Sequence, residues 1–359
     1  MKYIIDRSKA KSAYMQLYEF LRNDIVSGIY PFGSKLPSKR LIAEECGVSV
    51  VTAEHAISLL CDEGYAEPRE RSGYFVVFKK EDVFSVAEYP EQSYSAPKSF
   101  PSHTFPFSVM AKTMRKVLSE QGENIFIKSP NNGLYELRFA ICRYLARSRG
   151  IIADPDCIFI GSGAEYMYGL IVTLLGRERI WGIEEPSYEK IEKVYSSQGI
   201  MFEKLKLGND GIKSSCLAET KASVLHISPY RSFPSGVTAS ASKRREYIRW
   251  ASSGNRYIIE DDFESEFTLS KKPEDTVFAL SEKENVIYIN TFSKTVSPSL
   301  RAGYMVLPPT LAKLFSEKVG FYSCTLPAFD QYVLAELISS GSFERHINRV
   351  RRARRKSEK

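Results

Sequence analysis

The feature that most limits the possible folds of this chain is an alternation of short apolar runs with helical patterns after residue 105. Five of these runs are rich in β-branched and aromatic residues: CIFIGSG, RIWGIEE, ASVLHIS, RYIIEDD and NVIYINT. Strands that alternate with helices in this way build layered domains around a largely parallel sheet. We therefore predict an α/β domain over residues 105–359.

Residues 1–78 follow a different pattern. Apolar side chains first recur at helical spacing, at Tyr14, Leu17, Tyr18, Leu21 and Ile25. Ser38 and Ser49 can each cap a following helix, and two strand-like runs come after them around a tight turn at Ser72 and Gly73. Helix, helix, turn, helix and hairpin is the order of a winged helix-turn-helix. Residues 79–104 lack periodicity and contain several prolines and serines, which predicts a linker.

Charge and cysteine usage narrow the class of protein. The net charge is +7, yet residues 343–359 hold eight Lys and Arg against two Glu, so the charge does not by itself indicate a nucleic-acid partner. The chain contains no secretory signal and no run of about 18 apolar residues, which predicts a cytoplasmic protein without a membrane span. The six cysteines form no C-x-x-C pair and the four histidines are scattered, so we expect reduced thiols and no metal site.

Residues with chemical potential follow the predicted strands, where open α/β sheets bind their ligands. Lys294 comes after NVIYINT, and two interpretations are open: it pairs with a nearby carboxylate, or its amine bonds to the aldehyde of a cofactor. Asp261 and Tyr188 follow two other strands, where they can face a ring cation and a flat ring. A glycine-rich turn at residues 161–163 opens a helix, as phosphate sites do, and Arg301 follows Lys294.

An amine, a carboxylate, an aromatic ring, a guanidinium and a helix N-terminus match the groups of pyridoxal 5′-phosphate (PLP). The segments SGAE, EEPSY, SPYRSFPSGVTAS, IIEDDFESEF and TFSKTVSPSLRAGY resemble, in that order, the fold-type I aminotransferase domain, which has a mixed, mostly parallel sheet. The N-terminal segment YEFLRNDIVSGIYPFGSKLPSKRLIAEECGVSVVTAEHAISLLCDEGYAEPRERSGYFV extends the resemblance to nearly the whole chain. The chain resembles the MocR subfamily of GntR regulators, in which a winged helix-turn-helix is fused to an aminotransferase-like domain.

The resemblance implies a role for each residue of a PLP site. Lys294 is the point of covalent attachment, Asp261 pairs with the ring nitrogen, and Tyr188 stacks on the ring. The remaining cofactor-binding residues that the family implies are Arg301, Ser293, Thr291, Ala164, Glu165 and Phe263. Because fold-type I sites are built at a subunit interface, the resemblance also implies a homodimer, with a small amine or amino acid as effector.

The chain departs from the family pattern at several positions. Phe263 replaces a tyrosine that contacts the phenolic oxygen of the cofactor, and one lost hydrogen bond weakens binding by roughly 0.5–1.5 kcal/mol. Glu165 replaces a glutamine beside the phosphate, where a carboxylate is unfavourable unless it turns away. The segment PYRSFPSG is expected to place Arg231 and Ser232 near the ring. The family continues into a C-terminal subdomain, whereas the sequence ends at Lys359, so we expect part of the substrate cleft to be missing.

The DNA-binding half departs from the family as well. Its recognition helix usually begins Ser-Arg-x-Thr, but here Ser49-Val50-Val51-Thr52 has no arginine. Val50 can contact a thymine methyl group but cannot form the paired hydrogen bonds that recognise guanine. The predicted DNA contacts are Lys39, Arg40, Ser49, Val50, Val51, Thr52, Arg69, Arg71 and Gly73. The alternative is that these are ordinary surface residues.

Three functions fit these patterns. The leading hypothesis is a DNA-binding transcriptional regulator that uses its aminotransferase-like domain, with PLP, to sense an effector and has little or no transaminase turnover. The second is a PLP-dependent aminotransferase with an appended DNA-binding domain. The third is a degenerate regulator that no longer binds PLP, which the Phe263 substitution would favour.

Overall fold

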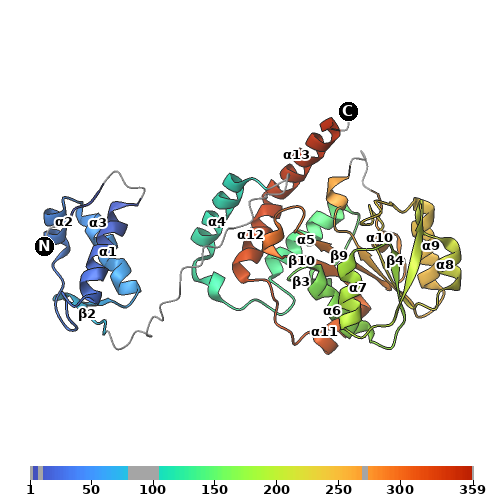
Figure 1. The fold of residues 1–359 in the computed structure, drawn as a ribbon, viewed down its shortest axis with the longest axis horizontal. Helices are drawn as coiled ribbons and strands as arrows, with labels where there is room; N and C mark the ends of the chain where they lie inside the picture. Colours follow the sequence, from blue (N-terminus) through green and yellow to red (C-terminus); the bar gives the residue numbers. More distant parts are fainter. Residues whose placement is uncertain (1–2, 7–10, 80–104, 269–273, 358–359) are drawn as a thin grey trace. The chain divides into compact units, whose positions relative to one another are not determined.

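A computed structural model of the chain describes residues 3–6, 11–79, 105–268 and 274–357. The chain divides into two compact units, Met1–Pro97 and Lys98–Lys359 (Figure 1). The predicted linker at residues 79–104 lies outside the described residues except for Lys79, so its bounds remain a prediction.

Unit 1 is a winged helix-turn-helix, as predicted. Its elements are α1 (Ala13–Val26), α2 (Lys39–Cys46), α3 (Val50–Asp62), β1 (Ala66–Arg69) and β2 (Gly73–Val76). The serine caps are confirmed: Ser38 Oγ accepts the N–H of Leu41 at 3.2 Å, and Ser49 Oγ accepts the N–H of Thr52 at 3.1 Å. Gly47 ends α2 with a φ of +64°, a backbone conformation that glycine adopts without strain.

The turn of the wing begins earlier than predicted. The sequence placed it at Ser72 and Gly73, but Gly73 already pairs with Arg69 in the antiparallel ladder. The N–H of Ser72 donates to the carbonyl of Arg69 at 2.9 Å, and Arg71 adopts a left-handed φ of +56°. The turn thus lies at residues 70–72, where Arg71 is exposed, and Gly73 has a φ of +109° at the start of β2.

Unit 2 is built on an eight-stranded sheet with the order β3-β10-β9-β8-β7-β4-β5-β6. The strands are β3 (Ile158–Gly161), β4 (Trp181–Glu185), β5 (Phe202–Gly208), β6 (Gly211–Ile212), β7 (Val224–Ile227), β8 (Tyr257–Asp261), β9 (Val286–Thr291) and β10 (Gly303–Val306). The sheet is mixed and mostly parallel, as predicted. β10 runs antiparallel to both β3 and β9, and β6 runs antiparallel to β5.

Helices cover both faces of this sheet (Figure 1). The helices of unit 2 are α4 (Phe107–Gln121), α5 (Tyr135–Ser148), α6 (Ala164–Leu175), α7 (Glu189–Ser197), α8 (Ser214–Glu219), α9 (Ala241–Ser252), α10 (Val277–Leu280), α11 (Pro309–Val319), α12 (Ala328–Ser339) and α13 (Ser342–Ser357). Side chains alternate along β9, so that Ile287 and Ile289 pack with α6, α7 and α11. Val286 and Tyr288 face the opposite layer, where α5 and α12 cover one end and α9 and α10 the other.

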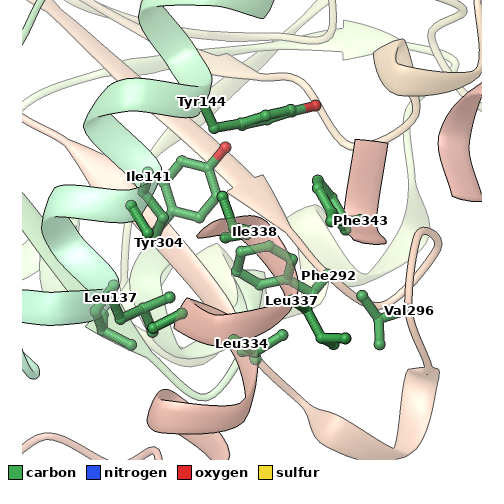
Figure 2. Packing of buried hydrophobic residues seen from close by; sticks show 14 of the residues in the cluster. Leu137, Ile141, Tyr144, Phe292, Val296, Tyr304, Leu334, Leu337, Ile338 and Phe343 are labelled. Atoms are coloured by element: carbon green, nitrogen blue, oxygen red, sulfur yellow. The ribbon is translucent and has the colours of Figure 1, made fainter. Parts of the chain in front are cut away.

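The segment after β9 is anchored in the core on the side of α5 and α12. Phe292 and Val296 are both buried, and the Phe292 ring lies 5.7 Å from the ring of Phe343. Figure 2 shows Phe292 and Val296 beside Leu337 of α12. Lys294 lies between these two anchors in the sequence, so packing on both sides fixes the backbone that carries it.

Candidate functional site

A cavity of about 250 Å³ lies at the edge of the sheet where the parallel strands end. Residues at or just after the ends of β3, β4, β7, β8 and β9 line it. β10 lies between β3 and β9 but runs antiparallel, so it begins at this edge, and Arg301 just before it lines the cavity as well. All nine residues predicted to bind a cofactor line this cavity: Ala164, Glu165, Tyr188, Asp261, Phe263, Thr291, Ser293, Lys294 and Arg301. The fold therefore brings the predicted set together, while the role of each residue in binding stays a prediction.

Lys294 follows β9 and has an exposed side chain. Two interpretations were open from the sequence, and one of them required a carboxylate partner. Among the residues that the structure describes, Lys294 forms no ion pair or hydrogen bond. The amine on the cavity wall is therefore available to a ligand.

Asp261, the last residue of β8, is buried and is positioned by side chains from two other elements. Its Oδ2 accepts a hydrogen bond from the hydroxyl of Tyr168 on α6, and Nε2 of His226 on β7 lies 3.6 Å from the same oxygen. The hydroxyl of Tyr195 holds the histidine in place by a hydrogen bond to its other ring nitrogen, Nδ1, at 2.6 Å. In the described chain, Asp261 Oδ1 has no hydrogen-bond partner. A buried acceptor in this condition is unfavourable, and a donor such as a protonated ring nitrogen would satisfy it.

A subsite suited to an anion lies at the N-terminus of α6. The first N–H groups of a helix lack intrahelical partners and carry the positive end of its dipole. Gly163 precedes α6 with a φ of +98°, and a Cβ atom there would lie 3.3 Å from Nη2 of Arg301. Glycine is therefore favoured both by the backbone and by the close approach of the guanidinium. Amide groups and a guanidinium together are the donors that bind a phosphate.

The carboxylate of Glu165 lies in this same subsite. Its Oε2 accepts a hydrogen bond from Nη2 of Arg301, and its Oε1 accepts one from Nζ of Lys190 at 2.6 Å. The bond from Lys190, together with the Arg301 guanidinium, holds the pKa of Glu165 below its usual range. The side chain is thus ionised at neutral pH, and it bridges two cations instead of turning away from the subsite.

Two aromatic side chains line the cavity, and a buried acid is bonded to Ser228, another of its lining residues. The rings of Tyr188 and Phe233 are 6.1 Å apart at an angle of 75°, and both are partly exposed. Behind the cavity, Glu184 accepts the N–H of Ser228 at 3.2 Å and the hydroxyl of Ser232. Burial raises the pKa of Glu184 to about 8, so this carboxyl keeps its proton at neutral pH.

Arg231 and Ser232 were expected near the ring, but neither of them lines the cavity. Ser232 is buried and bonds to Glu184, whereas Arg231 is exposed and its backbone N–H donates to Thr238 Oγ1 at 3.1 Å. Sequence reasoning also missed five lining residues: Tyr168, Lys190, Ile191, Ser228 and Phe233. Tyr168 could have been found, since it lies one helical turn after Ala164 and so shares its face.

The predicted DNA contacts lie on α2, α3 and the wing. Seven of them are exposed and two, Lys39 and Thr52, are partly exposed; the exposed ones are Arg40, Ser49, Val50, Val51, Arg69, Arg71 and Gly73. Lys39 pairs with Glu54 at 2.5 Å and Arg69 with Glu67 at 2.9 Å. Arg40 and Arg71 take part in no ion pair among residues 3–6, 11–79, 105–268 and 274–357, so their charges are the more available to phosphates.

Comparison with known proteins shows which protein family each of the two units matches. The family described as "Bacterial regulatory proteins, gntR family" matches residues 13–76, and "Aminotransferase class I and II" matches residues 93–358. The uncharacterised HTH-type transcriptional regulator YdeL of Bacillus subtilis (strain 168) is 31% identical over 356 residues, which cover 96% of this chain and 77% of YdeL. The chain belongs to the gntR family, as a MocR-type member with an aminotransferase domain.

Further relatives agree with this assignment. The MocR-type chain is 29% identical to the probable rhizopine catabolism regulatory protein MocR of Rhizobium meliloti, over 97% of its own length and 76% of that protein. Its aminotransferase domain is similar to the crystal structure of Pyrococcus horikoshii kynurenine aminotransferase in complex with PMP, with a TM-score of 0.63 and 26% identity. The match covers 69% of this chain and 64% of the enzyme, so it shows the fold of this domain and not the enzyme's activity.

In the described part of this MocR-type chain, no helix combines the length and the apolar character that crossing a membrane would require.

Proposed function

We propose that this MocR-type regulator binds DNA through its winged helix-turn-helix and PLP in the cavity at the edge of its sheet. The observation that carries the proposal is the gathering of nine residues, dispersed between positions 164 and 301, around one cavity. Lys294 supplies an amine, Asp261 an unpaired buried acceptor and Arg301 a guanidinium. These are the groups that an aldehyde, a ring cation and a phosphate need.

Eight of the nine residues have a binding role in the proposal, and Phe263 is part of the cavity wall. Asp261 Oδ1 accepts the ring N–H, Tyr188 covers a face of the ring, and Lys294 holds the cofactor covalently. The phosphate lies against the remaining polar groups, which are Arg301, Ser293, Thr291 and the amides of Ala164 and Glu165. PLP supplies an electrophilic carbon that captures primary amines. A small amine or amino acid that enters the cavity is then the proposed effector.

Chemical trapping tests the cofactor proposal. Borohydride reduction in the presence of PLP should fix a cofactor mass on the peptide that contains Lys294, and Lys294→Met should abolish this product. Lys193→Met is the matched control, because Lys193 is exposed and pairs with Glu189 outside the cavity. Labelling of the peptide that contains Lys190, or unchanged labelling of Lys294→Met, would refute the assignment.

DNA binding is proposed to reside in residues 1–78, joined to unit 2 by a linker over residues 79–104. A duplex selected from a random library should bind the full chain with an affinity that falls steeply with salt. Arg40→Ala should weaken binding to all sequences and reduce the slope of log K against log salt by about 1. The control is Arg115→Ala, an exposed arginine of α4. Equal effects of the two substitutions would argue against a specific role for Arg40.

We also propose that the chain is a homodimer. Unit 2 exposes several large apolar side chains on α4, η2 (Gly122–Phe126) and α5, and such surfaces mark protein interfaces. They are Phe107, Phe126, Ile127, Tyr135 and Phe139. Light scattering of the purified chain should give the mass of two copies. Phe126→Asp should shift the equilibrium toward one copy, and a monomeric wild type at micromolar concentration would rule the dimer out.

A further inference from the structure

Glu165 places a carboxylate where the ligand's anion is expected to bind. It is the second residue of α6, directly after the glycine turn. Its Oε2 is bonded to Arg301, and its Oε1 is bonded to Lys190. The Glu165 side chain is 28% exposed and that of Arg301 51%, so both can be reached from the cavity opening. One donor nitrogen of the guanidinium that lines the cavity, Nη2, is therefore already bonded to a residue of the chain itself.

Two anions at this subsite compete for the same donors. A phosphate needs the Arg301 guanidinium and the amides at the start of α6, and these are the groups beside which the Glu165 carboxylate lies. The two like charges also repel each other at contact distance. A phosphate that takes the Nη2 donor of Arg301 must first displace the carboxylate from it.

We infer that Glu165 is an internal competitor that selectively lowers the affinity of the cavity for ligands with a phosphate group. The inference rests on the proposed function and adds a regulatory property to it. With Glu165 in place, occupancy of the cavity follows the concentration of free PLP. Without it, the cavity would be filled at a lower concentration of free PLP.

Lys190 is a positioning residue in this arrangement. It lies on α7, with its Nζ 5.9 Å from the centre of the Tyr188 ring, and its hydrogen bond goes to the oxygen of Glu165 that does not contact Arg301. When Arg301 turns to a phosphate, Glu165 keeps Lys190 as its partner. Lys190 therefore favours PLP binding by holding the competing carboxylate aside.

The test compares the affinities of the full chain for PLP and for pyridoxal, which lacks the phosphate, by titration of the cofactor's absorbance. Glu165→Gln keeps the side-chain shape and removes the charge. It should tighten PLP binding about tenfold or more, which corresponds to about 1.4 kcal/mol, and leave pyridoxal binding within about twofold. Glu189→Gln is the matched control, since Glu189 is on α7 beside Lys190 but pairs with Lys193 away from the cavity.

Lys190→Met separates the two parts of the inference. In the wild-type background it should weaken PLP binding, because Glu165 then depends on Arg301 alone. In the Glu165→Gln background it should have little effect, since no carboxylate remains to be held. An equal loss in both backgrounds would mean that Lys190 contacts the phosphate directly, which would overturn its positioning role.

The outcomes distinguish this inference from the function on which it rests. If the wild type binds PLP but Glu165→Gln does not bind it more tightly, the competitor role of Glu165 is refuted and the proposed function is not. If neither protein binds PLP or pyridoxal, the proposed function is refuted together with the inference. A parallel gain for PLP and pyridoxal would also count against the inference, because the effect would then not act through the phosphate.

Discussion

Replacing Glu184 by glutamine is expected to make the stability of unit 2 less dependent on pH. Glu184 is on β4 and only 5% exposed, and its two oxygens accept hydrogen bonds from Ser228 and Ser232. Burial raises its pKa to about 8, against 4.5 for an ordinary glutamate. Glutamine has the same shape, stays neutral at every pH, and can accept from the Ser228 N–H while its amide donates to the Ser232 hydroxyl.

The sign and size of the effect follow from proton linkage. Between pH 4.5 and about 8 the folded state holds a proton that the unfolded state has released, so stability falls as the pH rises through this window. Each pH unit contributes about 1.36 kcal/mol, which gives about 4 kcal/mol between about pH 5 and about pH 8. Burial also raises the pKa of Glu260 and Glu266 to about 7, but both residues are present in both proteins and cancel in the comparison.

Tryptophan fluorescence during urea unfolding provides the assay. Both tryptophans of the chain, Trp181 and Trp250, are buried in unit 2, so the signal reports that unit alone. Glu184→Gln should match the wild type near pH 5 and exceed it by about 4 kcal/mol near pH 8. Glu185→Gln, at the partly exposed next position of β4, is the control for the loss of a carboxylate from the same strand. If the Glu184→Gln difference changes by less than about 1 kcal/mol over this range, the raised pKa is wrong.

Three further predictions concern ligand binding. Phe263→Tyr should tighten PLP binding by about 0.5–1.5 kcal/mol in an absorbance titration, because a hydroxyl is added to the cavity wall, and unchanged affinity would contradict this. Gly163→Ala should destabilise unit 2, because the φ of +98° strains an alanine, and it should also weaken PLP binding by the folded protein, since the added Cβ would lie 3.3 Å from Nη2 of Arg301. Urea unfolding and absorbance titration measure the two effects, and an unchanged PLP affinity of the folded variant would contradict the second. Val51 is 73% exposed at the start of α3, where it can contact the methyl group of a thymine. Uracil lacks this methyl group, so replacing thymine by uracil in a selected duplex should weaken binding by the wild type but not by Val51→Ser. Gel-shift titration of both proteins checks this.

The order of elements and the composition of the cavity wall were largely predictable. Asp261 and Thr291 each end a buried strand, and parallel strands end at one edge, so periodicity and chain order were enough to bring such residues together. β5 was missed because Glu203, Lys204 and Lys206 interrupt its apolar pattern. β10 was missed because it is only four residues long and follows a turn-rich segment.

The side chains that bond to one another were harder to predict from the sequence. Nothing in the spacing indicates that Lys190 reaches Glu165, because the contact depends on how α7 packs beside α6. The pairing of Tyr168 with Asp261 likewise joins residues on different elements. In the wing, the turn was expected at Ser72 and Gly73, and nothing in the sequence indicates that Arg71 adopts a positive φ before Gly73 pairs with Arg69.

The place of β10 has a consequence for how the chain is made. β10 is the last strand in the sequence, yet it lies between β3 and β9 and carries Arg301 to the cavity. Domains fold as units during synthesis, with the N-terminal one first. The helices and strands described in unit 1 end by Val76, so we expect it to fold while most of unit 2 is still untranslated. The nascent chain then acquires its DNA-binding unit well before the wall of the cavity is complete.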